Sequence, residues 1–530
     1  MKNKFFSLIL LIFNLFFLAK IYVVPSPALS FQYSPSMDVT KLFSNFNFRT
    51  ITINNTSKFD LKYEPISIKI EFSYGEAINN SLSLIDAVGA VIPFQILSQE
   101  FYPGTPYYRS INLIFLGNLS KNSSKSYQLL YSPSLHANVQ SLKSDLKLFE
   151  NNLSIGLENN FYNVIIRKNS TQGICSLSPR AFNASLIDPI IGFPGIYIYL
   201  PSGRRITTLS FSNTSTVIAI NGSLISEILY QGFYDSISYH NSIKFYSSNP
   251  SILSESILSW NSSSKPQFLY PFYIAIPKQT FSKIYLFNCS EEINLELING
   301  SKSFKFSNLI LLQNPLYGLV IFFDPLNFNC SRVIIQSVQE NYILLAIQTN
   351  SSTIPKEGNI TFRSLFRIVE GEIENDFLEH LLSLYKYGLN IKIEKPFARI
   401  EAEAPQSMIV DTKIQINITL IFYEDVKDVW FNITCYRLEN DVFDASAKIA
   451  KFFLGNLRKG YFKIYTFHIC FDREGFYLIP VLLYNNKMFS YAFIPIMVNL
   501  PLLLPDVNIE VQLLNFEGNR KIENIRVYSL

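Results

Sequence analysis

The chain has 530 residues, of which 16% are charged, and a formal net charge of +4 at pH 7. This length exceeds what one hydrophobic core normally supports, so the sequence predicts about two to four domains. The charges form neither a basic tract nor an acidic tail. This argues against nucleic acid as a partner.

The first 30 residues have the pattern of a signal peptide. Lys2 and Lys4 precede the apolar stretch 5–19, as in the charged and apolar regions of such leaders. Ala28 and Ser30 form a small-x-small pattern, so we expect cleavage after Ser30. An uncleaved anchor is the alternative and would be the only membrane contact, although the stretch is shorter than the ~20 residues that cross a bilayer.

The chain carries far more Asn-x-Ser/Thr sequons than chance placement would give, eighteen in all. With the leader, they predict an exported protein that is glycosylated outside the cell or at the cell surface. No sequon follows Asn432, so the C-terminal domain is a candidate surface for docking other cell-surface proteins. The sequon asparagines are Asn54, Asn55, Asn79, Asn118, Asn122, Asn152, Asn169, Asn183, Asn213, Asn221, Asn261, Asn288, Asn299, Asn329, Asn350, Asn359, Asn417 and Asn432.

Strand patterns dominate the chain. Apolar residues alternate with polar ones over 66–72 and again over 414–420, which predicts half-buried strands. Helical periodicity is convincing over 372–389, where Phe377, Leu381 and Leu384 share a face. The sequence therefore predicts an all-β, multidomain protein with one notable helix.

Composition shifts divide the mature chain into units at 31–132, 133–396 and 397–504. A predicted hairpin follows at 505–530. A lone hairpin is marginal in water, so it pairs with the third unit, pairs with another protein, or begins a further β-domain.

The first unit contains, in order, the segments 51–56, 66–72 and 84–95, with a turn at Asp86 and Gly89. This succession resembles the small RIFT-type β-barrel of exo-rhamnogalacturonan-lyase-like proteins. The second unit is similar to the β-supersandwich of galactose-mutarotase-like domains, through the segments 157–166, 217–228, 243–246 and 252–260. The helix at 372–389 and the strand 391–394 would close it.

The third unit resembles an immunoglobulin-like sandwich, through the strands 414–420, 429–435 and 462–471 and the turn before Tyr477. Lyases and glycosidases related to the first two units carry a separate catalytic toroid or barrel, which this chain lacks. The resemblance therefore implies a non-catalytic role in glycan binding or envelope structure. A polysaccharide-active lyase, hydrolase or epimerase is the alternative, and a subunit of a surface assembly is a second one.

A mutarotase-like enzyme needs a histidine acid and a carboxylate base that face a sugar across a concave sheet. In the second unit this makes His240, with Glu255 or Glu227, the catalytic candidate. Trp260 and the tyrosine pair Tyr107 and Tyr108 are candidates for stacking on sugar rings, with core packing as the alternative for Trp260.

Five cysteines without CxxC or metal-ligand spacing predict no metal site, and no cofactor is expected. In the third unit, the alternation of the strand 429–435 predicts that Cys435 points into the core. The alternation of the strand 462–471 predicts the same for His468 and Cys470. A disulfide between Cys435 and Cys470 is the first choice and one between Cys289 and Cys330 the second. The alternative is that all five are small buried apolar residues.

Overall fold

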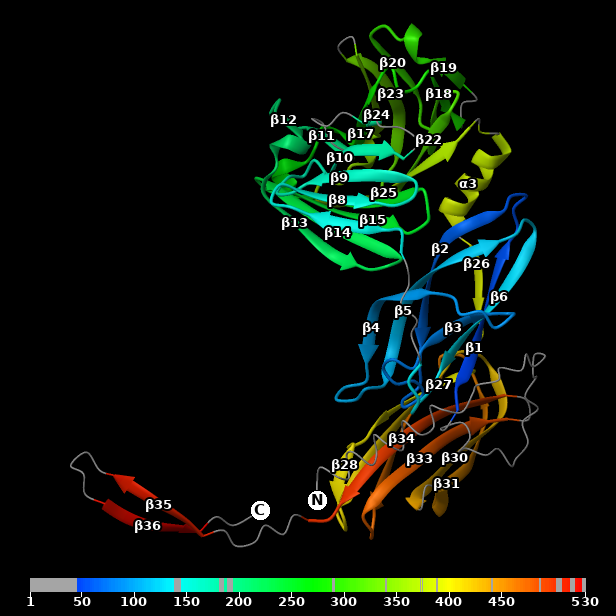
Figure 1. Ribbon diagram of the computed structural model, residues 1–530, viewed down its shortest axis with the longest axis vertical. Coiled ribbons are helices and arrows are strands. Elements are labelled where there is room, and N and C mark those ends of the chain that lie inside the picture. Colours follow the sequence, from blue (N-terminus) through cyan, green and yellow to red (C-terminus); the bar gives the residue numbers. More distant parts are fainter. Residues whose placement is uncertain are drawn as a thin grey trace.

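The computed structural model describes residues 45–501 and 508–526, except for 138–143, 181–184, 188–193, 288–290, 339–340, 372, 374, 388, 440–441, 486–487 and 515–519. These residues are mostly strands that form several sheets (Figure 1), which confirms the prediction of an all-β, multidomain protein. The leader lies outside them, so the signal peptide stays a prediction. Within the described ranges, none of the helices has the length and apolarity needed to cross a membrane.

The first domain consists of two sheets that enclose a core of residues such as Ile51, Ile66 and Phe115. The four-stranded sheet has the order β26 (Asn390–Ile393), β1 (Asn47–Asn55), β6 (Ser123–Tyr131) and β3 (Ser83–Asp86). The three-stranded sheet has the order β2 (Leu61–Glu71), β5 (Tyr108–Leu119) and β4 (Phe94–Phe101).

These strands do not close into the expected barrel. β26 occupies the free edge of β1, with Ile391 opposite Ile53 and Ile393 opposite Ile51, so β1 cannot also pair with β2. The placement of β26 also corrects the prediction that the strand at 391–394 closes the second domain. The chain builds the second domain between β6 and β26 and then returns to the first.

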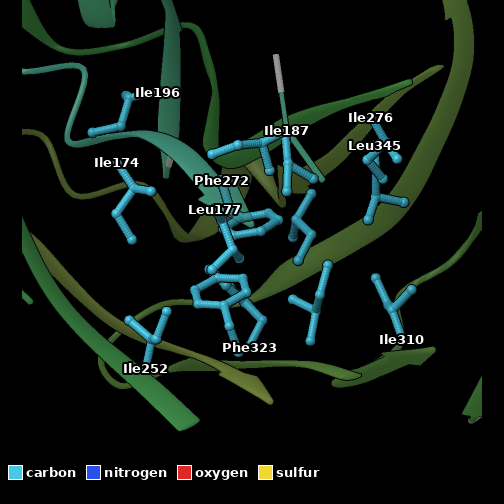
Figure 2. Packing of buried hydrophobic residues seen from close by; sticks show 14 of the residues in the cluster. Ile174, Leu177, Ile187, Ile196, Ile252, Phe272, Ile276, Ile310, Phe323 and Leu345 are labelled. Atoms are coloured by element: carbon cyan, nitrogen blue, oxygen red, sulfur yellow. The ribbon is translucent and has the colours of Figure 1, made fainter. Parts of the chain in front are cut away.

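The second domain packs a nine-stranded sheet against a six-stranded and a four-stranded sheet. Its core lies between them, where Ile252, Ile310 and Phe323 of the large sheet meet Phe272 and Leu345 (Figure 2). The nine-stranded sheet has the order β13 (Ser212–Asn221), β14 (Ile225–Tyr234), β15 (Ile237–Tyr246), β16 (Ser251–Trp260), β25 (Gly358–Glu370), β22 (Tyr317–Pro325), β21 (Leu309–Gln313), β18 (Lys283–Leu286) and β19 (Glu291–Asn294).

The six-stranded sheet has the order β12 (Arg205–Thr207), β11 (Gly195–Tyr199), β17 (Phe268–Pro277), β24 (Tyr342–Thr349), β23 (Cys330–Val338) and β20 (Ser301–Lys305). The four-stranded sheet has the order β10 (Ile174–Pro179), β9 (Tyr162–Arg167), β8 (Ser154–Glu158) and β7 (Lys147–Glu150). Short 3-10 turns are η2 (Thr208–Ser210), η3 (Ser262–Ser264), η5 (Leu295–Leu297) and η6 (Ser351–Thr353).

The predicted helix forms as α3 (Asn375–Tyr387). Leu378 and Leu381 pack on Leu309 and Leu311 of the large sheet, whereas Leu384 belongs to the core of the first domain. The helix therefore lies where the two domains meet (Figure 1).

The third domain is a sandwich of a three-stranded and a five-stranded sheet, and its immunoglobulin likeness stays a prediction. The first sheet has the order β27 (Ala398–Glu403), β29 (Lys413–Phe422) and β32 (Phe462–Cys470). The second has the order β28 (Ser407–Ile409), β34 (Phe489–Asn499), β33 (Gly475–Tyr484), β30 (Val426–Glu439) and β31 (Val442–Leu457). The hairpin of β35 (Asn508–Leu514) and β36 (Arg520–Arg526) forms a two-stranded sheet of its own.

The face assigned to β32 from the sequence is wrong. Tyr465 and Phe467 pack on Phe431 in the core, with ring centroids 5.3 Å and 6.1 Å away, so His468 and Cys470 lie on the exposed face. A strand has two alternating faces, so choosing the other set of residues reverses every side chain.

The predicted Cys435–Cys470 disulfide is therefore not formed, because Cys435 is buried in the sandwich and Cys470 is an exposed thiol. Cys289 lies outside the described residues, and its predicted partner Cys330 is a free thiol, so this second disulfide is not formed either.

Candidate functional site

The outer face of the nine-stranded sheet holds the three predicted catalytic residues. In the antiparallel pairing of β14, β15 and β16, Lys244 lies opposite Glu227, and Ser242 lies opposite Glu255. His240 is two residues from Ser242 on β15, and alternate residues of a strand share a face. The sheet therefore brings His240, Glu227 and Glu255 to one side, as predicted.

Both carboxylates on this face are already engaged. Glu255 accepts hydrogen bonds from Lys244 Nζ at 2.8 Å and from Arg363 Nε at 2.7 Å. Burial by itself would raise the pKa of Glu255, but the hydrogen bond and charge of Lys244, together with Arg363, outweigh it and lower the pKa. Glu227 accepts a hydrogen bond from the Ser242 hydroxyl and lies 3.9 Å from Lys244 Nζ. The lowered pKa makes the Glu255 carboxylate a poor proton acceptor near neutral pH.

His240 is exposed and sits edge-on to the ring of Phe233, with the ring centroids 6.0 Å apart. Within the part of the chain that the structure describes, no hydrogen bond or ion pair joins His240 to Glu227 or Glu255. Exposed apolar side chains surround the ladder of charges, and those of Val217, Leu229, Phe233 and Ile257 are each more than a third exposed. The face therefore combines charged groups, apolar patches and an aromatic edge, as a binding surface does.

Two elements cover the ends of this face and leave its middle open. The helix α3 lies over β21 and β22. The first domain covers a corner, where Ile114 packs with Ile225 and Tyr246. There Gln95 Oε1 accepts hydrogen bonds from the backbone N–H groups of Leu224 and Ile225, at 3.1 Å and 3.2 Å.

The predicted sugar-stacking aromatics are buried. Trp260 is 4% exposed, belongs to the core of the second domain and donates from Nε1 to the carbonyl of Pro355 at 3.3 Å. Tyr108 is 1% exposed and donates its hydroxyl to Asn79 Oδ1. Tyr107 lies against Tyr74 in a cluster that includes the core of the third domain. The sequence places Tyr107 and Tyr108 beside a predicted loop, but it does not show that the third domain packs against Tyr107.

A hollow that the sequence did not predict lies where α3 meets the second domain. It has a volume of about 240 Å³, and Arg180, Arg367, Phe161 and Phe377 are among its lining residues. Both arginines are paired, because Arg180 Nη2 lies 2.7 Å from Glu158 and Arg367 Nη1 lies 3.2 Å from Glu64. The lining comes from six separate segments, so no local pattern could have indicated it.

The sequon asparagines lie mostly on the surface. Of the sixteen that the structure describes, eleven are exposed and four are partly exposed. Asn55 is buried, because its amide group donates to the carbonyls of Phe59 and Ser120. Asn183 and Asn288 lie outside the described residues.

Comparison with known proteins gives no family. No family model and no curated protein matches the chain. Among solved structures, the chain is similar to a CARDB domain from Pyrococcus furiosus at 15% identity, over 20% of this chain and 90% of that one, with a TM-score of 0.16. It is also similar to a GH36 alpha-galactosidase from Geobacillus stearothermophilus at 9% identity, over 42% of this chain and 41% of that one, with a TM-score of 0.30.

A third similar structure is a candidate aldose 1-epimerase from Escherichia coli K12, at 8% identity, over 42% of this chain and 99% of that one, with a TM-score of 0.26. Two of these three proteins are named for sugars. At such low identities and TM-scores, the similarities establish neither a shared fold nor an activity for this chain.

Proposed function

We propose that the protein is exported as an N-glycosylated, non-catalytic protein of the cell surface or extracellular space, and that it binds glycans. The observation that carries the non-catalytic part is the engagement of Glu255 by Lys244 and Arg363 beside an exposed His240. General base catalysis needs a carboxylate that accepts a proton near the working pH, and a carboxylate between two cations does so poorly.

The surface position of the sequons supports the extracellular part. Oligosaccharyl transfer needs an accessible amide, and fifteen of the sixteen described sequon asparagines are at least partly exposed. Glycan binding is assigned to the open stretch of β13 to β16. There the rings of Phe233 and His240 lie beside charged side chains that can donate and accept hydrogen bonds to hydroxyl groups.

The experiment is expression of the full chain in a eukaryotic secretory host. We expect protein in the medium, an N-terminus that follows Ser30 by mass spectrometry, and a large mobility shift after enzymatic removal of N-glycans. Unglycosylated protein that stays inside the cell would overturn the extracellular assignment.

A glycan array on the secreted protein tests the binding. Phe233→Ala should weaken binding about fivefold, since one aromatic contact contributes on the order of 1 kcal/mol. Leu297→Ala is the control, because this side chain is 70% exposed and lies away from the face, in η5. If the protein instead modifies a bound glycan chemically, and the His240→Asn variant no longer does so, the alternative function as a polysaccharide-active enzyme would be supported.

A further inference from the structure

The outer face of the five-stranded sheet in the third domain carries an apolar cluster on β33 and β34. Leu478, Leu482, Tyr491 and Phe493 are buried on it, although they do not belong to the core of the sandwich. The first domain covers the β34 side, where the backbone N–H of Phe493 donates to the carbonyl of Tyr74 at 3.0 Å.

The cover is missing over β30 and β31. Trp430 of β30 lies opposite Phe453 of β31, with ring centroids 5.1 Å apart. Trp430 is 38% exposed and Phe453 is 51% exposed. Two adjacent exposed rings form a contiguous apolar patch, and such patches mark surfaces that contact another group.

A sequon lies directly beside these rings. Asn432 follows Trp430 by two residues on β30, so the two side chains share a face and stand about 6.5 Å apart along the strand. Asn432 is partly exposed, and within the described part of the chain its Oδ1 atom is buried without a hydrogen-bond partner. Opposite Asn432 stands Lys451, an exposed side chain whose ammonium lies 5.4 Å from the centre of the Trp430 ring.

We propose that Asn432 carries an N-linked glycan whose first sugar packs on Trp430 and Phe453 and covers this part of the sheet. The proposal rests on the proposed export and glycosylation of the chain. The apolar C–H face of an N-acetylglucosamine ring matches an aromatic face, whose π-electrons attract these hydrogens. The hydroxyl and amide groups of the sugar supply hydrogen-bond donors around the unpartnered Oδ1, and Lys451 can move aside because it is exposed.

The chain contains a matched control in the same domain. Asn417 and Asn432 both begin the sequence Asn-Ile-Thr on a strand whose isoleucine, Ile418 or Ile433, is 1% exposed. The residue two positions earlier is Gln415 in one case and Trp430 in the other. The Asn417 side chain is also already engaged, since it donates to Glu403 and accepts from Gln415 and Thr466.

The test compares the secreted full-length protein with Thr434→Ala, which removes the sequon at Asn432, and Thr419→Ala, which removes the one at Asn417. Asn432→Gln removes the same glycan by replacing the acceptor asparagine instead of the threonine. It must therefore change the Tm and the fluorescence in the same way as Thr434→Ala. Glycopeptide mass spectrometry gives site occupancy, and thermal unfolding with intrinsic fluorescence gives the Tm and the environment of Trp430.

We expect an occupied Asn432 and, in Thr434→Ala, a Tm lowered by about 2–4 °C with red-shifted Trp430 emission. Thr419→Ala should change neither, and in a Trp430→Ser/Phe453→Ala background Thr434→Ala should have no further effect on Tm. The packing proposal would be overturned if Asn432 is glycosylated but loss of its glycan lowers the Tm no more than loss of the glycan at Asn417. An empty Asn432 beside other occupied sequons would overturn this proposal alone, whereas a chain without any glycan would also overturn the proposed function.

Discussion

Glu64→Gln should weaken the junction between the first and second domains by about 3 kcal/mol. Glu64 lies in β2, and its carboxylate is 3.2 Å from Arg367 Nη1 of β25, with side chains only 6% and 11% exposed. Tyr385 of α3 accepts a second hydrogen bond from the same Nη1 at 2.9 Å. Removing one partner of a buried ion pair costs about 3–5 kcal/mol, because it leaves the other charge buried and uncompensated.

The assay is urea unfolding followed by tryptophan fluorescence. The chain has two tryptophans, so a Trp430→Phe background leaves Trp260, which is buried in the second domain, as the reporter. A loss of about 3 kcal/mol lowers the urea midpoint by about 1 M for an m-value of about 3 kcal/mol/M.

The control is Asp376→Asn, which breaks an ion pair that also spans this junction. Asp376 lies 3.4 Å from Lys58 Nζ, but the side chains of Lys58 and Asp376 are 80% and 61% exposed, so the expected cost is below about 0.5 kcal/mol. Equal midpoints for Glu64→Gln and Asp376→Asn would refute the reasoning, since burial is what separates the two pairs.

Three further predictions concern single side chains. Cys470 should react with iodoacetamide in the folded protein and Cys175 only after unfolding, because Cys175 is buried and burial raises the pKa of its thiol; equal labelling in peptide maps would contradict this. The pKa of Glu255 is lowered from its ordinary 4.5, so its stabilising effect is present above pH 4.5 and lost as the pH falls through the folded-state pKa. The stability gap between wild type and Glu255→Gln in urea unfolding should therefore narrow from pH 7 to pH 2, and a constant gap would count against the cation pairing. Gly75→Ala should lower the Tm more than Gly104→Ala, because both have φ near +70° but a Cβ at Gly75 would lie 1.9 Å from the carbonyl oxygen of Phe493; equal melting would disprove this close approach.

The sequence predicts elements well where one alternating face is clearly apolar. Over 66–72 and 414–420 the buried set is Ile and Leu or Phe against polar residues, and those faces are confirmed. In β32 both alternating faces contain apolar residues. Ile464 and Cys470 on one face therefore compete with Tyr465 and Phe467 on the other for the position in the core. The aromatic pair prevails because two rings bury more apolar area against Phe431.

Only part of the candidate site follows from the sequence. Strand alternation places His240 and Glu255 on one face, but Arg363, which lowers the pKa of Glu255 together with the nearer Lys244, is 108 residues away from it. The exposure of Trp430 depends on how far the first domain extends over the neighbouring strands β33 and β34, and no local pattern contains that information. Contacts between distant segments therefore decide the chemistry of both faces.

The first domain makes polar contacts with both of its neighbours, and these bear on catalysis. Towards the third domain, the backbone N–H of Tyr74 donates to Ile400 at 2.8 Å, and Arg399, which is 8% exposed, lies 3.4 Å from Glu71. Towards the second domain lies the buried pair of Glu64 and Arg367. A hinge motion that brought a further carboxylate to His240 would have to break such contacts, and in the pair of Glu64 and Arg367 both side chains are buried. The contacts at both junctions therefore favour the proposed binding surface over a catalytic site that assembles on closure of the domains.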